Sequence, residues 1–286
     1  MDILVKVVLP LGLAFIMFSL GLGLKGADFY RVIQRPTSFF IGAFNQMILL
    51  PIVAFVIIIA FGISGELAVG LMILAACPGG VTSNILSRLA KADVALSVTL
   101  TAVISLTTVI TVPIILSFAF GYFMAGQASP VNITITAITM FALTVVPIVL
   151  ALVAQRLFPN AMKRAAPACS HIATILFAII IIAALATNWA FFLENVQIIG
   201  GALACLIIIL MIIGFVVPRL LGRSKTEAKT ISIETGIQNG TLGIAIAALL
   251  VGGDAGFTAY SIPSAVYGIL MYFISLPFVM LFRRIS

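Results

Sequence analysis

Charge is what this sequence lacks most. Only 8% of its 286 residues are charged and 63% are hydrophobic, whereas a soluble domain carries about 25% charged residues. A water-soluble fold would have nowhere to place so many apolar side chains, so the composition predicts an integral membrane protein. The net charge of +7 could suggest nucleic acid as a partner, but the basic residues lie in short connections between apolar runs. They indicate membrane topology, and we expect the lipid bilayer, and no nucleic acid, as a partner.

Cysteine and histidine are also scarce. Cys77, Cys169 and Cys205 lie in or beside apolar segments without CxxC or Cys/His spacing, so the sequence indicates neither a disulfide framework nor a zinc site. We interpret the single histidine, His171, as an interfacial polar residue, with a proton relay as the alternative. HExxH, GxSxG, a nucleotide-binding loop and a haem pair are all missing. We therefore expect no enzyme and no cofactor.

Apolar runs of about 20 residues, the length that a helix needs to cross a bilayer, occur nine times. No run shows the alternation of a membrane β-barrel strand. The first run lacks a basic leading segment and an A-x-A site, so we interpret it as a span and not as a signal peptide. The sequence predicts an all-α integral membrane protein with nine transmembrane helices, at residues 3–24, 37–61, 66–88, 93–121, 131–154, 168–187, 196–217, 231–251 and 257–282.

The connections between these runs alternate in charge. The even-numbered connections contain no Lys or Arg, and Lys6 is the one basic residue outside the odd-numbered connections and the C-terminal end. The positive-inside rule makes the basic side cytoplasmic. We therefore expect an outside N-terminus, an inside C-terminus and a multi-pass protein of the cell membrane, as in the bacterial inner membrane. The basic residues on that side are Lys25, Arg31, Arg35, Arg88, Lys91, Arg156, Lys163, Arg164, Arg219, Arg223, Lys225, Lys229, Arg283 and Arg284.

Two of the nine segments are interrupted. The third, "LMILAACPGGVTSNILSRLA", contains Pro78, which removes a backbone donor, and the eighth, "ISIETGIQNGTLGIAIAALL", has Gly236 and Gly240 around a polar cluster. The breaks are five crossings apart, so the two segments run in opposite directions, as in an inverted repeat. We expect one transmembrane transporter domain, with a first repeat at 1–125 (four helices) and a second at 126–286 (five helices). Paired breaks point to a transporter's binding site, and the alternative is a helix-packing face.

Glu234 is the one acidic residue of eight that we place inside the membrane, where a charge is costly. It is either protonated, or reaches the interface, or binds a mobile cation. Oxygen-bearing side chains of other spans favour a bound cation. Because the site has so few charged side chains, it suits a monovalent ion better than a divalent one. For the hydroxyl groups, the alternative is hydrogen bonding to their own helix. The candidate oxygen donors are Asn45, Gln46, Ser83, Asn84, Gln238 and the hydroxyl groups of Ser97, Thr99, Thr101, Ser105, Thr107, Thr108 and Thr111.

Four stretches carry a resemblance to a known family: "CPGGVTSN" at 77–84, "ALSV" at 95–98, "ETGIQN" at 234–239 and "PSA" at 263–265. With them, nearly the whole chain resembles the bile acid:sodium symporter family. The resemblance implies alternating access between a panel and a core domain, with two crossing discontinuous helices in the core. It also implies two sodium ions, one bound by Ser83, Asn84, Ser97, Thr101 and Glu234, and the other by Gln46, Glu234, Gln238 and the backbone carbonyls of Thr235 and Ile237.

The last span departs from the bile-acid-transporting members, which follow "PSA" with an aromatic-His-Asn sequence. Here the chain reads "PSAVYGILMYF". We therefore expect an organic anion, either a bile acid or a small carboxylate such as a pantoate-like acid. The half-helix N-termini after each break offer N–H groups to a carboxylate, and we place Asn239 and Thr82 there as substrate-binding residues.

The expected function is a sodium-coupled symporter. The first alternative is a proton-coupled organic-anion carrier, in which Glu234 loads and unloads the proton. The second alternative is a channel.

Overall fold

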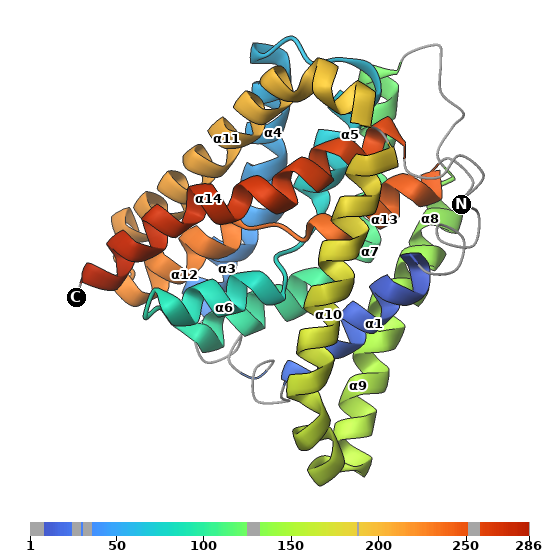
Figure 1. Ribbon diagram of the computed structural model, residues 1–286. Helices are drawn as coiled ribbons and strands as arrows, with labels where there is room; N and C mark the ends of the chain where they lie inside the picture. The colour runs from blue at the N-terminus through green and yellow to red at the C-terminus, as the bar shows by residue number, and fades with distance from the viewer. Residues whose placement is uncertain are drawn as a thin grey trace.

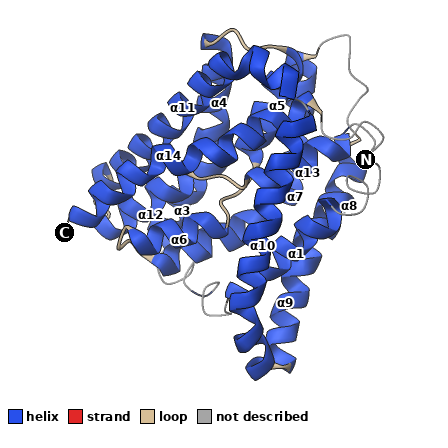
Figure 2. Ribbon diagram, in the orientation of Figure 1, coloured by secondary structure: helices blue, strands red, loops and turns tan. Residues whose placement is uncertain are grey.

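The computed structural model describes residues 9–24, 30, 36–124, 132–187, 189–250 and 258–285, and these residues form helices and short links (Figure 2). All eleven candidate site residues lie within these ranges. The predictions that concern Lys6, Lys25, Arg31 and Arg35 lie outside the described residues.

Most of the predicted spans are single or nearly continuous helices. The exceptions are the third and the eighth, each of which is divided in two. In chain order the elements are α1 (Leu9–Gly23), α3 (Pro36–Phe44), the π-helix η2 (Asn45–Leu49), α4 (Leu50–Ala60), α5 (Gly65–Ala76), α6 (Val81–Leu89), α7 (Val94–Phe123), α8 (Ile133–Met140), the π-helix η3 (Phe141–Val145), α9 (Val146–Leu157), α10 (Pro159–Thr187), α11 (Trp189–Leu220), α12 (Lys225–Gly236), α13 (Gly240–Leu250), the 3-10 helix η4 (Ala259–Ser261) and α14 (Ile262–Arg284).

Six of the described helices are long and apolar enough to cross a membrane, and the bent pair α5–α6, with 61° between its halves, could be a seventh. The protein is thus an all-helical membrane protein with a broken helix pair. Two helices begin earlier than the hydropathy predicted. Helix α10 begins at Pro159, because a proline is well suited to a first helical turn.

Helix α12 begins at Lys225 because of a capping box that the hydropathy could not reveal. The Ser224 hydroxyl accepts a hydrogen bond from the N–H of Glu227 (3.2 Å), and the Glu227 carboxylate accepts one from the N–H of Ser224 (3.0 Å). Glu227 also accepts a bond of 2.7 Å from the Ser38 hydroxyl of α3. Glu234 therefore lies nine residues into a capped helix, not just beyond a loop.

The helices pack in two groups. Helices α1, α9 and α10 pack against one another at the lower right of Figure 1, with α8 leading into α9 through η3, and the helices from α3 to α7 and from α11 to α14 form the larger group. Small residues bring helices of the larger group close together. A Cβ atom on Gly214 of α11 would lie 2.8 Å from the Cα atom of Ser232 of α12, so only glycine permits this approach.

Hydrogen bonds connect the ends of several helices at one end of the larger group. The Thr230 hydroxyl donates to the Asp93 carbonyl (3.0 Å), and the Lys229 ammonium donates to the Ile285 carbonyl (2.6 Å). The link between α6 and α7, the start of α12 and the end of α14 therefore lie at the same end. We call it the basic end, after its described residues Arg88, Lys91, Arg219, Arg223, Lys225, Arg283 and Arg284.

Candidate functional site

The two interruptions contact each other inside the larger group. Residues 77–80 separate α5 from α6, and residues 237–239 separate α12 from α13. The backbone N–H of Asn239 donates a hydrogen bond of 2.8 Å to the carbonyl of Pro78. Helix α5 packs against α13, and α6 packs against α12. Backbone groups freed from two helices thus meet at a single point.

The Glu234 side chain lies at this meeting point and is only 1% exposed. Its carboxylate accepts hydrogen bonds from the hydroxyls of Ser97 and Thr101 on α7, the second at 2.9 Å. Gly79 passes directly beside it, because a Cβ atom there would lie 2.5 Å from Oε2 of Glu234. The glycine after Pro78 therefore lets the first break pack against the carboxylate.

The first helical turn of α6 adds two more of the predicted oxygen donors. The Ser97 hydroxyl lies 2.8 Å from Oδ1 of Asn84, and the Ser83 hydroxyl lies 3.5 Å from that of Thr101. Ser97 has a single hydroxyl proton but faces two acceptors, Asn84 Oδ1 and the Glu234 carboxylate. One of these oxygens is therefore always left without that proton. All five residues of the first predicted ion site lie together.

Two buried glutamines also lie near Glu234. Gln46, in the π-helical turn η2, donates from Nε2 to the backbone carbonyl of Glu234 (2.6 Å), and Gln238 donates to the carbonyl of Thr235 (2.8 Å). Among the described residues, the Oε1 atoms of both glutamines have no hydrogen-bond partner. Ile237 is buried in the same unwound segment. A buried oxygen without a donor is costly, so these two oxygens are available to a cation.

The described residues offer no cluster of three His, Cys, Asp or Glu side chains that could hold a metal ion. The oxygen atoms around Glu234 come instead from hydroxyls, amides and backbone carbonyls. We refer to the side chains of Gln46, Ser83, Asn84, Ser97, Thr101, Glu234 and Gln238, together with the carbonyls of Thr235 and Ile237, as the oxygen cluster.

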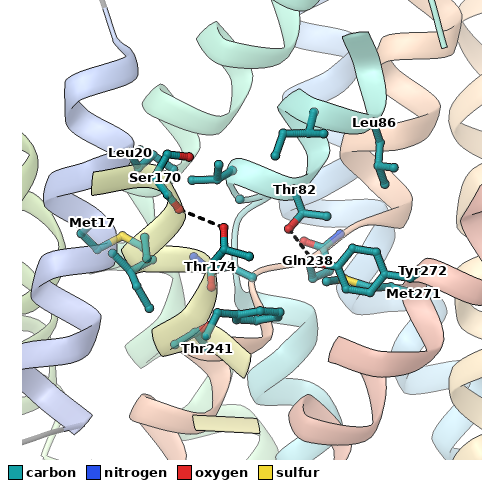
Figure 3. Close-up of a pocket in the computed structure, with 17 residues that line it drawn as sticks. Met17, Leu20, Thr82, Leu86, Ser170, Thr174, Gln238, Thr241, Met271 and Tyr272 are labelled. Atoms are coloured by element: carbon teal, nitrogen blue, oxygen red, sulfur yellow. Dashed lines mark hydrogen bonds between the residues drawn. The ribbon is translucent and has the colours of Figure 1, made fainter. Parts of the chain in front are cut away.

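A cavity of about 230 Å³ lies between the helix breaks and the smaller helix group (Figure 3). Thr82 and Asn239, the two predicted substrate-binding residues, both line it. The Thr82 hydroxyl lies 3.2 Å from the hydroxyl of Tyr272 on α14, and Oδ1 of Asn239 accepts a hydrogen bond of 3.1 Å from the N–H of Leu242. The remaining wall, from α1 and α10, is mostly apolar.

A second cavity, of about 280 Å³, adjoins the first and reaches the basic end. The two cavities share Leu20, Val81, Ile85 and Ser170 in their walls, and the second also contacts Asn84 and Arg88. Asn84, a member of the oxygen cluster, therefore also lines this cavity.

Several residues at the site were not singled out from the sequence. Thr174 and Thr241 line the first cavity, and the hydroxyl of Thr241 has no partner among the described residues. The Tyr267 hydroxyl donates to the carbonyl of Gly236, at the end of α12. Ser170 and Thr174, spaced i,i+4 on α10, offered a signal for a polar helix face. His171, in contrast to these residues, lines neither cavity. It is exposed, and its Nδ1 lies 2.7 Å from the carbonyl of Pro167.

Known proteins resemble this chain along most of its length. The profile of the Sodium Bile acid symporter family matches residues 10–195. The uncharacterized sodium-dependent transporter YocS of Bacillus subtilis is 29% identical over 90% of this chain and 77% of its own length. The probable sodium/metabolite cotransporter BASS2 of Oryza sativa chloroplasts is 29% identical over 82% of this chain, which spans only 55% of that protein. The ileal sodium/bile acid cotransporter of Oryctolagus cuniculus is 28% identical over 84% of this chain and 68% of its own length.

Proposed function

The chain belongs to the Sodium Bile acid symporter family, and from this premise we propose that it couples sodium ions to the uptake of an organic anion by alternating access. Membership of this family makes it a membrane transporter and not an enzyme. Three relatives carry sodium-dependent transport in their names, which supports sodium as the coupling ion.

The single observation that carries the proposal is the buried Glu234 carboxylate at the contact between two helix breaks. Among the described residues, no Lys or Arg forms a salt bridge with it, and its carboxylate accepts hydrogen bonds from hydroxyl groups. A carboxylate in the membrane interior needs a compensating charge. A mobile cation can supply this charge, and its release makes the site empty again.

Two sodium ions would share the oxygen cluster. The first would be bound by Ser83, Asn84, Ser97, Thr101 and Glu234, where Ser97 cannot satisfy both of its acceptors with one proton. The second would be bound by Gln46, Glu234, Gln238 and the carbonyls of Thr235 and Ile237. The two glutamine oxygens without a donor support this second site. Both ions would be bound by neutral oxygens and one shared carboxylate.

The cavities support an organic anion as the cargo. The first cavity combines a mostly apolar wall with Thr82 and Asn239, at the starts of α6 and α13. Helix N-termini attract carboxylates, so the anionic group would lie against the breaks and the apolar part against α1 and α10. A volume of about 230 Å³ favours a small carboxylate, such as a pantoate-like acid, over a bile acid.

The membrane arrangement follows from the same proposal. We infer nine spans with the N-terminus outside and the basic end in the cytoplasm, in an inverted repeat of residues 1–125 and 126–286 with crossing helices α5–α6 and α12–α13. The smaller helix group would be the panel and the larger group the core. Since the second cavity reaches the basic end, this conformation would face the cytoplasm, and the membrane would be a bacterial inner membrane.

Uptake into proteoliposomes tests the proposal. A thermal-shift screen of small carboxylates and bile salts, with and without sodium, would first identify a substrate. We expect accumulation of that substrate under a sodium gradient alone. Accumulation that ignores sodium and follows a pH gradient would establish the proton-coupled carrier, and flux without saturation or accumulation would establish the channel.

A further inference from the structure

Arg88 is the one ionised side chain among the described residues that line the two cavities. It is exposed and lies in the last turn of α6. The oxygen cluster does not include it, and neither the ion sites nor the substrate site of the proposed function assigns it a role.

One face of α6 connects Arg88 to the oxygen cluster. Val81, Asn84, Ile85 and Arg88 all line the second cavity, as their helical spacing requires. Asn84 precedes Arg88 by four residues, or about 6 Å along the helix axis. The Asn84 side chain contacts Ser97, which donates to Glu234. The cavity therefore extends from the guanidinium group to the edge of the proposed first ion site.

We propose that the second cavity is the route by which sodium leaves that site toward the basic end, and that Arg88 lowers the sodium affinity by electrostatic repulsion. This inference rests on the proposed sodium coupling. A fixed positive charge about 10 Å from a bound cation weakens its binding about 2- to 10-fold, for effective dielectric constants between about 80 and 25. A carrier that releases its ion into the cytoplasm benefits from weak binding on that side.

Neighbouring charges define the control that the test needs. Lys91 lies three residues beyond Arg88, and the Asp93 carboxylate accepts hydrogen bonds of 3.1 Å from the N–H groups of Ala95 and Leu96 at the start of α7. These groups stay in place when Arg88 is changed. Arg284 is exposed in the last turn of α14 and lines neither cavity, so its replacement measures the effect of surface charge alone.

The experiment measures the sodium concentration at half-maximal thermal stabilisation of the purified full chain, with choline replacing sodium to keep ionic strength constant. At an ionic strength of about 0.05 M, we expect Arg88→Gln and Arg88→Met to lower this midpoint about 2- to 10-fold. Arg88→Lys, which keeps the charge, and Arg284→Gln should match the unchanged protein. At about 1 M the difference should disappear, because the Debye length falls to about 3 Å.

An unchanged or higher sodium midpoint in both uncharged variants would overturn the inference, and so would an equal shift in Arg284→Gln. A shift that persists at high salt would also overturn it, because it would indicate a packing change and not repulsion. Failure of the proposed function would look different: the unchanged protein would then be stabilised no more by sodium than by choline.

Discussion

A methyl group at Gly79 should damage the ion sites without removing any of their oxygen atoms. Its Cβ atom would lie 2.5 Å from Oε2 of Glu234, 3.1 Å from the Ser83 hydroxyl and 3.3 Å from Nε2 of Gln46. The carboxylate would have to move by several tenths of an ångström, and it is held between α7 and the break. Overpacking of this kind costs about 1–3 kcal/mol. If the whole cost falls on the ion-bound state, sodium affinity drops about 5- to 150-fold.

The neighbouring glycine provides a matched control for Gly79→Ala. A Cβ atom on Gly80 would lie 3.7 Å from its nearest neighbour, an atom of Asn239, which is ordinary contact. Sodium titration of thermal stability should therefore give a much higher midpoint for Gly79→Ala and a nearly unchanged one for Gly80→Ala. If both variants kept the original midpoint, or both lost sodium binding equally, the reasoning from steric contact with Glu234 would be refuted.

Three further substitutions test other parts of the proposal. Glu234→Ala should abolish sodium-dependent uptake, because both ion sites share this carboxylate, and near-normal uptake would exclude it as a shared ligand. Gln46→Ala should raise the sodium midpoint roughly 5- to 150-fold, for a lost buried interaction of about 1–3 kcal/mol, with normal expression; an unchanged midpoint would count against the second site. Ser224→Ala should lower thermal stability by about 1 kcal/mol through the lost helix cap and leave the sodium midpoint unchanged, whereas a shifted midpoint would show that the cap also acts on the ion sites.

Much of the site was readable from the sequence because the membrane restricts where polar groups can lie. Pro78 and the glycines around Gln238 indicated where helices must unwind, and the structure brings these two segments into contact. Glu234 stood out as a carboxylate within an apolar run, and the hydroxyls of Ser97 and Thr101 do bond to it. The number of nine spans stays a prediction.

Hydropathy could not reveal features that depend on single side-chain contacts. The capping box of Ser224 and Glu227 extends α12 beyond its apolar run, and the polar residues of its first turns hid this part of the helix. Tyr272 lies within the stretch "PSAVYGILMYF", which departs from the family pattern, and its hydroxyl lies beside that of Thr82 in the cavity wall. The contact between Tyr272 and Thr82 joins residues that are far apart in the sequence, so no local sequence pattern predicts it.

The hydrogen bond between Asn239 and Pro78 is made entirely by main-chain atoms. Evolution can therefore change the side chains around this hydrogen bond, and with them the substrate range of the carrier. The contact between the two broken helices persists through such changes. In such a scaffold, point substitutions in the cavity wall can alter the substrate specificity without disrupting the contact between the two helix breaks.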